Sequence, residues 1–257
     1  MFRGQSQERV LNITTLGRFR VTLGDQVLSE DTSRASRVWQ LFKYLVTNRE
    51  RDIPTDTIIA NLWPEGWPKN AERALRNLVY RLRQSLGSIE DPPHSYITLS
   101  RGMYRFNTKA LYWLDIEEFE QRFAELKAMT LSQAVGQVRK YQECLNLYQE
   151  EYLPEELHAD WVVPVRNYYR RLYLETFSDY IKVLNVINDL PAICAACEQA
   201  LLVEPLEEAV HIQFIDYLLQ TGKTNDALAH YSYASSMLYR EMGIKPSPEM
   251  IMAYRRS

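Results

Sequence analysis

The side chains best suited to chemistry lie in the stretch ERALRNLVYRLRQSLG, residues 72–87, which holds four arginines and a single acid, Glu72. At the roughly 100° per residue of a helix, its apolar residues form one stripe, and the opposite face carries arginine, asparagine and glutamine. These side-chain types make paired hydrogen bonds to guanine and adenine edges in the major groove of DNA. A merely solvated helix face would instead alternate acids and bases four residues apart. The pattern therefore predicts a helix whose basic face binds an external anion.

Short elements flanking this helix would hold it in place. Alternating apolar residues in 10–30 predict two or three short antiparallel strands. Asn70 is a suitable N-cap for the basic helix. Apolar residues at helical spacing predict a helix over Ala35–Asn48 and a short helix over Asp56–Trp63. A turn flanked by β-forming residues predicts a hairpin, with strands Tyr96–Leu99 and Met103–Asn107 around Ser100, Arg101 and Gly102.

The order of strands, helix, short helix, basic helix and hairpin is that of a winged helix-turn-helix. In such a module the third helix enters the major groove, and Arg101 at the hairpin tip can reach phosphate or the minor groove. The alternative is a small α/β domain whose arginines serve only solubility. The pattern alone leaves both interpretations open.

From about Ala110 onward the apolar spacing is almost wholly helical. An offset of 34 residues aligns Ala192–Glu207 with Asp226–Glu241, and it places Asn188 opposite Gly222 at a turn between helices. That period, with small residues where helices cross, indicates tetratricopeptide-like repeats, which offer a concave surface for protein contacts. A generic helical bundle is the alternative.

Composition and charge narrow the class of protein. Residues 1–109 carry 17 Lys and Arg against 11 Asp and Glu, a balance of +6, and residues 110–257 carry 13 against 22, a balance of −9. We therefore predict a basic nucleic-acid-binding domain over 1–109 and an acidic helical domain over 110–257.

No apolar run approaches the roughly 18 residues of a membrane span, so a cytoplasmic protein with no membrane partner is expected. The Cys194–Cys197 motif is expected to pack between helices, and no catalytic residues, metal ligands or cofactor-binding residues are predicted.

Two stretches, LWPEGWPKNAERALRNLVYRLRQSLG and YITLSRGMYRFN, closely resemble the winged-helix domain of the Streptomyces antibiotic regulatory protein (SARP) type, related to OmpR-like output domains of response regulators. Further along, ADWVVPVRNYYRRLYLETF and EMGIKPSPEM resemble the bacterial transcriptional activator domain that follows it in the same family. Together the resemblances cover about residues 11–255. The fold class that they imply is mainly α: an OmpR-like winged helix-turn-helix with short antiparallel strands, followed by an all-α tetratricopeptide-like domain.

The resemblance implies a transcriptional activator, not an enzyme, that binds promoter-proximal direct repeats in double-stranded DNA, with a homodimer on DNA, and recruits RNA polymerase. Arg76 and Asn77 are expected to read bases, and Arg73, Arg81, Arg83 and Arg101 to contact phosphate. The predicted DNA-contacting set is Arg73, Arg76, Asn77, Tyr80, Arg81, Arg83, Gln84 and Arg101. The competing hypothesis is a helical interaction scaffold or ligand-responsive regulator whose winged helix mediates protein contacts.

Overall fold

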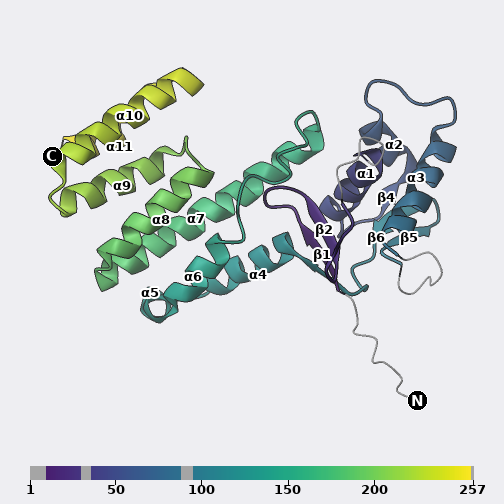
Figure 1. Cartoon of the computed structure of the whole chain (residues 1–257), viewed down its shortest axis with the longest axis horizontal. Helices are drawn as coiled ribbons and strands as arrows, with labels where there is room; N and C mark the ends of the chain where they lie inside the picture. The colour runs from purple at the N-terminus through teal and green to yellow at the C-terminus, as the bar shows by residue number, and fades with distance from the viewer. Residues whose placement is uncertain (1–9, 30–35, 88–94, 256–257) are drawn as a thin grey trace, which may run out of the picture. The chain divides into compact units, whose positions relative to one another are not determined.

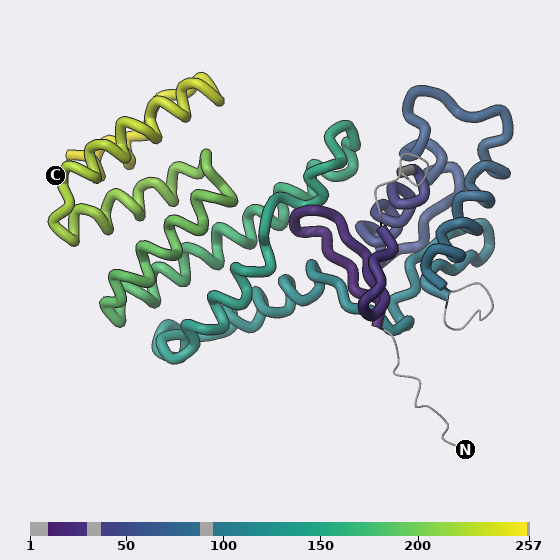
Figure 2. The backbone as a smooth tube through the Cα atoms, in the orientation of Figure 1, coloured from purple at the N-terminus to yellow at the C-terminus, as the bar shows by residue number. Residues whose placement is uncertain are grey.

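The computed structural model describes residues 10–29, 36–87 and 95–255. It divides into two compact units (Figures 1 and 2): the first comprises Met1–Glu118 with Tyr152–Asn167, and the second comprises Phe119–Glu151 with Tyr168–Ser257. The compact units therefore partition the chain differently from the sequence division after Lys109, which stays a prediction. The sequence SIEDPPHS, residues 88–95, predicts a loop, and residues 88–94 of it lie outside the described residues.

The first unit begins with a four-stranded sheet. Its strands are β1 (Leu11–Thr14), β2 (Arg20–Leu23), β3 (Gln26–Val27) and β7 (Tyr112–Leu114), in the order β3-β2-β1-β7. The predicted antiparallel strands over 10–30 are confirmed, because β1 pairs with β2 and β2 with β3. The chain beyond about Ala110, predicted to be almost wholly helical, also contains the strand β7, which pairs in parallel with β1.

Three helices follow: α1 (Ser36–Thr47), α2 (Thr55–Leu62) and α3 (Ala71–Ser85). They confirm the predicted helices to within about two residues at each end, the usual uncertainty of helix boundaries. Both α2 and α3 contact α1. The apolar faces meet in one core, whose fully buried members include Leu41, Phe42, Ile58, Leu75 and Leu82.

A second sheet completes the winged-helix part, in the order β4-β6-β5. Its hairpin strands are β5 (Ile97–Ser100) and β6 (Met103–Phe106), which confirms the predicted hairpin. The third strand, β4 (Ile53–Pro54), was not predicted, and it pairs with β6 next to the start of α2. Figure 1 shows this small sheet beside α1, α2 and α3.

Asp115 joins the end of β7 to the end of its neighbouring strand β1. Its carboxylate is 2% exposed and accepts hydrogen bonds from the backbone N–H groups of Thr15 and Leu16 and from the Thr15 hydroxyl at 2.7 Å. Asp115 also stands at the start of α4 (Asp115–Lys127), where the N–H of Ile116 donates to it at 2.8 Å. Burial raises the pKa of Asp115, and these donors oppose that rise because they stabilise the charged form.

The segment 152–167 packs on α1 although it is distant in sequence. Tyr152 is fully buried, its hydroxyl lies 2.6 Å from that of Thr47, and it bridges to Leu16 and Gly17. Lys43, only 7% exposed, forms ion pairs with Glu155 at 2.7 Å and Glu156 at 2.9 Å.

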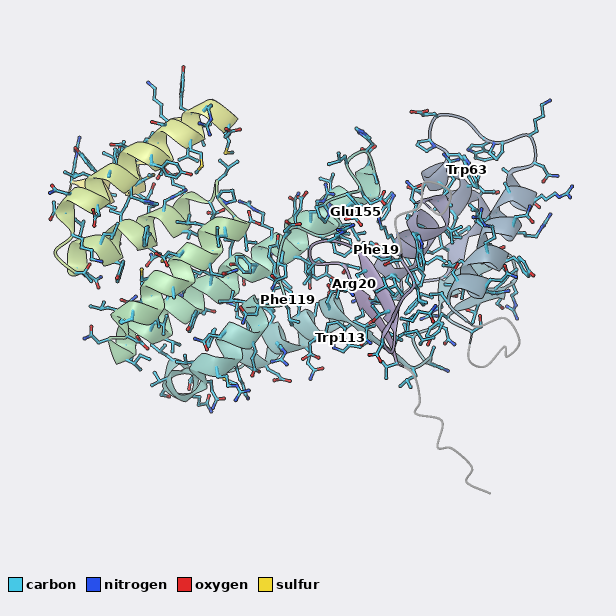
Figure 3. The ribbon with its side chains drawn as sticks, in the orientation of Figure 1. Phe19, Arg20, Trp63, Trp113, Phe119 and Glu155 are labelled. Carbon is cyan, nitrogen blue, oxygen red and sulfur yellow. The ribbon has the colours of Figure 1, made fainter. Side chains whose placement is uncertain are left out.

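The Lys43 ammonium group also lies 4.8 Å from the ring centroid of Phe19. Lys43 thus contacts both Phe19 and Glu155, which are far apart in the sequence and are labelled in Figure 3. The segment also contains η3 (Asp160–Val162), and the Trp161 ring meets that of Tyr44 edge to face at 5.2 Å. These residues are therefore an integral part of the first unit's packing.

The second unit is helical. Its elements are the rest of α4, then α5 (Leu131–Ala134), η2 (Val135–Gln137), α6 (Val138–Leu145), the greater part of α7 (Val163–Ile187), α8 (Leu190–Val203), α9 (Glu208–Gln220), α10 (Thr224–Met242) and α11 (Pro248–Tyr254). Helix α9 packs against α8, α10 and α11, and Figure 1 shows α8, α9 and α10 next to one another.

The predicted 34-residue repeat is visible in the turns between helices. Asn188 and Gly222 both have positive φ, 56° and 73°, after α7 and α9 respectively. In each turn the next residue's N–H donates to a carbonyl five residues back, Asp189 to Leu184 at 3.0 Å and Lys223 to Leu218 at 2.8 Å. The same C-terminal cap thus recurs at the predicted offset, as expected of stacked helix pairs.

Among the described residues, none of the helices is both long enough and apolar enough to cross a membrane.

Candidate nucleic-acid interface

Helix α3 begins where the sequence predicts, because Asn70 caps it. The Asn70 side chain accepts a hydrogen bond from the N–H of Arg73 at 3.1 Å. One face is then buried against α1 and α2, with the exposed fraction at or below 9% for Leu75, Leu78, Val79 and Leu82. Burial of each such side chain contributes about 1.5–3 kcal/mol, so the apolar stripe fixes which face of α3 points outward.

The outward face carries most of the predicted contact residues. The exposed members are Arg73, Arg76, Asn77, Tyr80, Arg81 and Gln84. Tyr80 is 56% exposed, and its hydroxyl accepts a hydrogen bond from the Gln84 amide at 2.8 Å. Among the described residues, neither the Arg73 guanidinium nor the Asn77 amide has a hydrogen-bond or ion-pair partner. The face thus presents hydrogen-bonding groups that remain available to a ligand.

Arg76 has one partner on its own helix. Its Nη1 lies 3.4 Å from a carboxylate oxygen of Glu72, and both side chains are more than 60% exposed. An exposed pair of this kind contributes only about 0.3–0.5 kcal/mol. Phosphate or a base edge can therefore displace Glu72 at little cost.

Arg83 differs from the other arginines of α3. It is only half-exposed, and its Nε and Nη2 donate to the carbonyl oxygen of Ile97 at 3.2 and 2.8 Å. The structure thus places Arg83 against strand β5, apart from the exposed set. The phosphate contact expected of Arg83 stays a prediction.

Arg101 lies at the tip of the hairpin. Arg101 and Gly102, with φ of 51° and 77°, form the two-residue connection between Ser100 and Met103, which are paired in the strand register. Two consecutive positive φ values are typical of a type I′ turn. The Arg101 side chain is exposed and has no hydrogen-bond or ion-pair partner within the described part of the chain.

Thr55 anchors the hairpin tip, a role that the sequence did not reveal. Its backbone N–H and its hydroxyl both donate to the carbonyl of Gly102, at 3.2 and 2.9 Å. Thr55 is also the first residue of α2, so the wing and the helix-turn-helix share an attachment point. Because the two residues are 47 positions apart, no local sequence pattern could have predicted the bond.

The loop from α2 to α3 exposes further groups beside this face. Trp67 is 59% exposed, and the Arg37 guanidinium lies 5.5 Å from the ring centroid of Trp63, which Figure 3 labels. None of these side chains was predicted to bind DNA. The aromatic and basic composition of the stretch WPEGWPK was the sequence signal that could have pointed to this loop.

Burial is the main cause of the pKa shift of Tyr104, a titratable group that α3 arginines influence. Burial raises the pKa of Tyr104, and Arg83 and Arg76 partly oppose the rise because their positive charges favour the phenolate. Elsewhere, Cys197 is fully buried and burial raises the pKa of its thiol to about 12, opposite to the direction of a redox-active thiol. Within residues 10–29, 36–87 and 95–255, no three His, Cys, Asp or Glu side chains are grouped to hold a metal ion.

Two protein-family models match the chain. The bacterial transcriptional activator domain matches residues 114–256, more than half of the chain. The chain belongs to this family. The model described as transcriptional regulatory protein, C terminal, matches residues 29–106, which contain α1 to α3 and the wing hairpin. The predicted SARP-type family membership is confirmed, and the matching families are transcription regulators, not enzymes.

Individual relatives agree with the family assignment. The chain is 24% identical over 256 residues to the transcriptional regulatory protein EmbR of Mycobacterium bovis, and equally to EmbR of Mycobacterium tuberculosis. These alignments cover 95% of this chain and 62% of EmbR.

The solved structure of Mycobacterium tuberculosis EmbR in complex with a low affinity phosphopeptide has a similar fold, with a TM-score of 0.72 and 22% identity. The similarity covers 97% of this chain and 65% of that one. Together with the family matches, it confirms the predicted fold class of a winged helix followed by a tetratricopeptide-like helical domain.

Proposed function

We propose that this transcription regulator is a cytoplasmic activator that binds DNA sequence-specifically. Helix α3 would read bases in the major groove, and Arg101 would contact the backbone or the adjacent minor groove. The observation that carries the proposal is the outward face of α3, where Arg73, Asn77 and Tyr80 are exposed opposite a fully packed apolar stripe. Arginine and asparagine on such a face suit guanine and adenine edges, and the exposed guanidinium groups suit phosphate.

The proposal extends to the arrangement on the promoter. The sequence resemblance favours two copies side by side on direct repeats, with RNA polymerase as the protein partner. A tandem arrangement follows from repeats in one orientation, since each copy then meets its neighbour through the same pair of unlike surfaces. In vitro transcription with purified RNA polymerase tests the activator role: added protein should increase transcript from a promoter that carries the repeat and leave a promoter without it unchanged.

The DNA-binding proposal is tested by selecting genomic fragments bound by the protein at controlled salt, followed by titration of the selected site and a random duplex. We expect Asn77→Ala to reduce discrimination between the two by about 1–3 kcal/mol, because it removes a base contact. Arg73→Ala should weaken both complexes alike and lower the salt slope by about 0.9, as expected for one phosphate contact. The matched control is Arg139→Ala on α6, whose side chain is 89% exposed and which should change neither quantity.

A second candidate function is a protein-binding winged helix within an interaction scaffold. Apolar exposure favours it, since Tyr80 on α3 and Leu99 on β5 are 56% and 50% exposed. The EmbR structure shows a relative bound to a phosphopeptide, so peptide recognition is a relevant comparison. A protein that binds no duplex even at low salt, but forms a stable complex lost in Tyr80→Ala, would replace the first proposal with this one.

A further inference from the structure

Arg83 makes a bond that links the recognition helix to the wing. Its Nε and Nη2 both donate to the carbonyl oxygen of Ile97, at 3.2 and 2.8 Å. Arg83 belongs to the last turn of α3, and Ile97 is the first residue of β5. The side chain of Ile97 is fully buried, so its backbone position is fixed by the core.

The strand register explains why this carbonyl accepts a bond from a helix. The N–H of Asn107 donates to the carbonyl of Tyr96, so Tyr96 and Asn107 are a hydrogen-bonded pair at the base of the hairpin. In antiparallel pairing, hydrogen-bonded and non-hydrogen-bonded pairs alternate, so Ile97 and Phe106 form a non-hydrogen-bonded pair. The Ile97 carbonyl therefore points away from β6, toward the free edge of β5, where Arg83 donates to it.

The same carbonyl belongs to a small network at the base of the wing. The Ser95 hydroxyl also donates to Ile97 O at 2.9 Å, and the Asn107 amide donates to Ser95 O at 2.9 Å. Ser95 is 6% exposed, so these bonds are shielded from water. A guanidinium can direct two donors at one oxygen, whereas a lysine ammonium would act as a single point of attachment.

We propose that Arg83 is a positioning residue that fixes the wing relative to the recognition helix, acting on DNA through Arg101. The hairpin tip is about 13 Å along β5 from the bond, at roughly 3.3 Å per residue. A small change in the angle of β5 at its base is therefore amplified at Arg101. This inference rests on the proposed function, because its effect on DNA requires the wing to contact the duplex.

The test is a double-mutant cycle of Arg83→Met and Arg101→Ala, with operator affinity as the readout. In the wild-type background, Arg101→Ala should reduce affinity roughly tenfold, and in the Arg83→Met background by about twofold or less, because the wing is already misplaced. Arg83→Lys should resemble Arg83→Met, since one ammonium does not restore the paired donors. Arg73→Ala is the matched control, and its effect should add to that of Arg101→Ala.

Three results together would overturn the inference and establish a direct phosphate contact. The effects of Arg83→Met and Arg101→Ala would be additive, and Arg83→Met would lower the salt slope by about 0.9. Arg83→Lys would also bind almost normally. A second readout uses the protein without DNA. Amide hydrogen exchange in β5 should be at least several-fold faster in Arg83→Met, or in Arg83→Lys if the first variant does not fold, and unchanged in Arg73→Met. If the wild type binds no duplex, the proposed function fails, and unchanged exchange in β5 would separately overturn the positioning role.

Discussion

Two histidines in the second unit are placed to make its stability depend on pH. The Nδ1 of His211 lies 2.9 Å from the Nε2 of His230, and the Nε2 of His211 lies 2.9 Å from the carbonyl of Pro205. A carbonyl only accepts, so His211 carries its proton on Nε2 and its Nδ1 must accept from Nε2–H of His230. The pair thus joins α9 to α10 through two neutral imidazoles.

Burial lowers the pKa of both rings, and for His230 it does so to about 4 from an ordinary value of 6.5, with His211 adding to the effect. Near His211, Glu207 and Glu208 act in the opposite direction. In the unfolded chain His230 binds a proton below about pH 6.5, whereas in the folded chain it stays neutral down to about pH 4. The free energy of unfolding therefore decreases as the pH falls through this window. A difference of 6.5 − 4 = 2.5 pH units corresponds to about 3.4 kcal/mol at 1.36 kcal/mol per unit. Because His230 is only half-buried, we expect about 1–2 kcal/mol.

Urea unfolding of the wild type and His230→Gln at pH 7.5 and 4.5 measures this contribution. Glutamine can still donate to His211 but cannot ionise, so the wild type should lose about 1–2 kcal/mol more than the variant between the two pH values. Carboxylate titration is common to both proteins and cancels in the comparison. The exposed His158 supplies the control, since His158→Gln should follow the wild type. An equal loss in wild type and His230→Gln would show that His230 does not contribute to the pH dependence of stability.

Two further predictions concern the first unit. Asp115→Ala leaves two buried backbone N–H groups after β1 without an acceptor, so we expect it to lower the unfolding free energy by about 2–4 kcal/mol, measured by urea titration. An unchanged midpoint would show that water or another group replaces the carboxylate. Lys43→Met leaves Glu156, 13% exposed, without its cation and should cost about 1–3 kcal/mol, part of which Glu156→Gln should restore in the double variant. Strict additivity of the two changes would contradict the pairing.

Local patterns predicted the parts of the fold that depend on local physics. The cap at Asn70 and the apolar stripe of α3 were readable because capping acts within one turn and amphipathic spacing within one helix. The turns at Asn188 and Gly222 were readable because a repeated cap leaves a repeated sequence position. The outward face of α3 could be predicted for the same reason.

Features that depend on distant partners were not predictable from one sequence. Strand β7 has only three residues, and its partner β1 lies about a hundred positions earlier, so no alternation is long enough to reveal it. The packing of Tyr152 on α1 depends on contacts across 105 positions. The bond from Arg83 to Ile97 also needed the structure, because an arginine on a basic helix carries the same sequence signal whether it faces DNA or a neighbouring strand.

In the proposed complex the outward face of α3 lies against bases. Site-specific photo-crosslinking tests it most directly, with a photoreactive phenylalanine analogue replacing Tyr80, an exposed aromatic residue on that face. The control places the analogue at Tyr239 on α10, which is 67% exposed. We predict crosslinks from position 80 to bases within the selected site, and none from position 239. Crosslinking to DNA from position 239 alone, or to protein alone from position 80, would show that the outward face of α3 does not lie against bases.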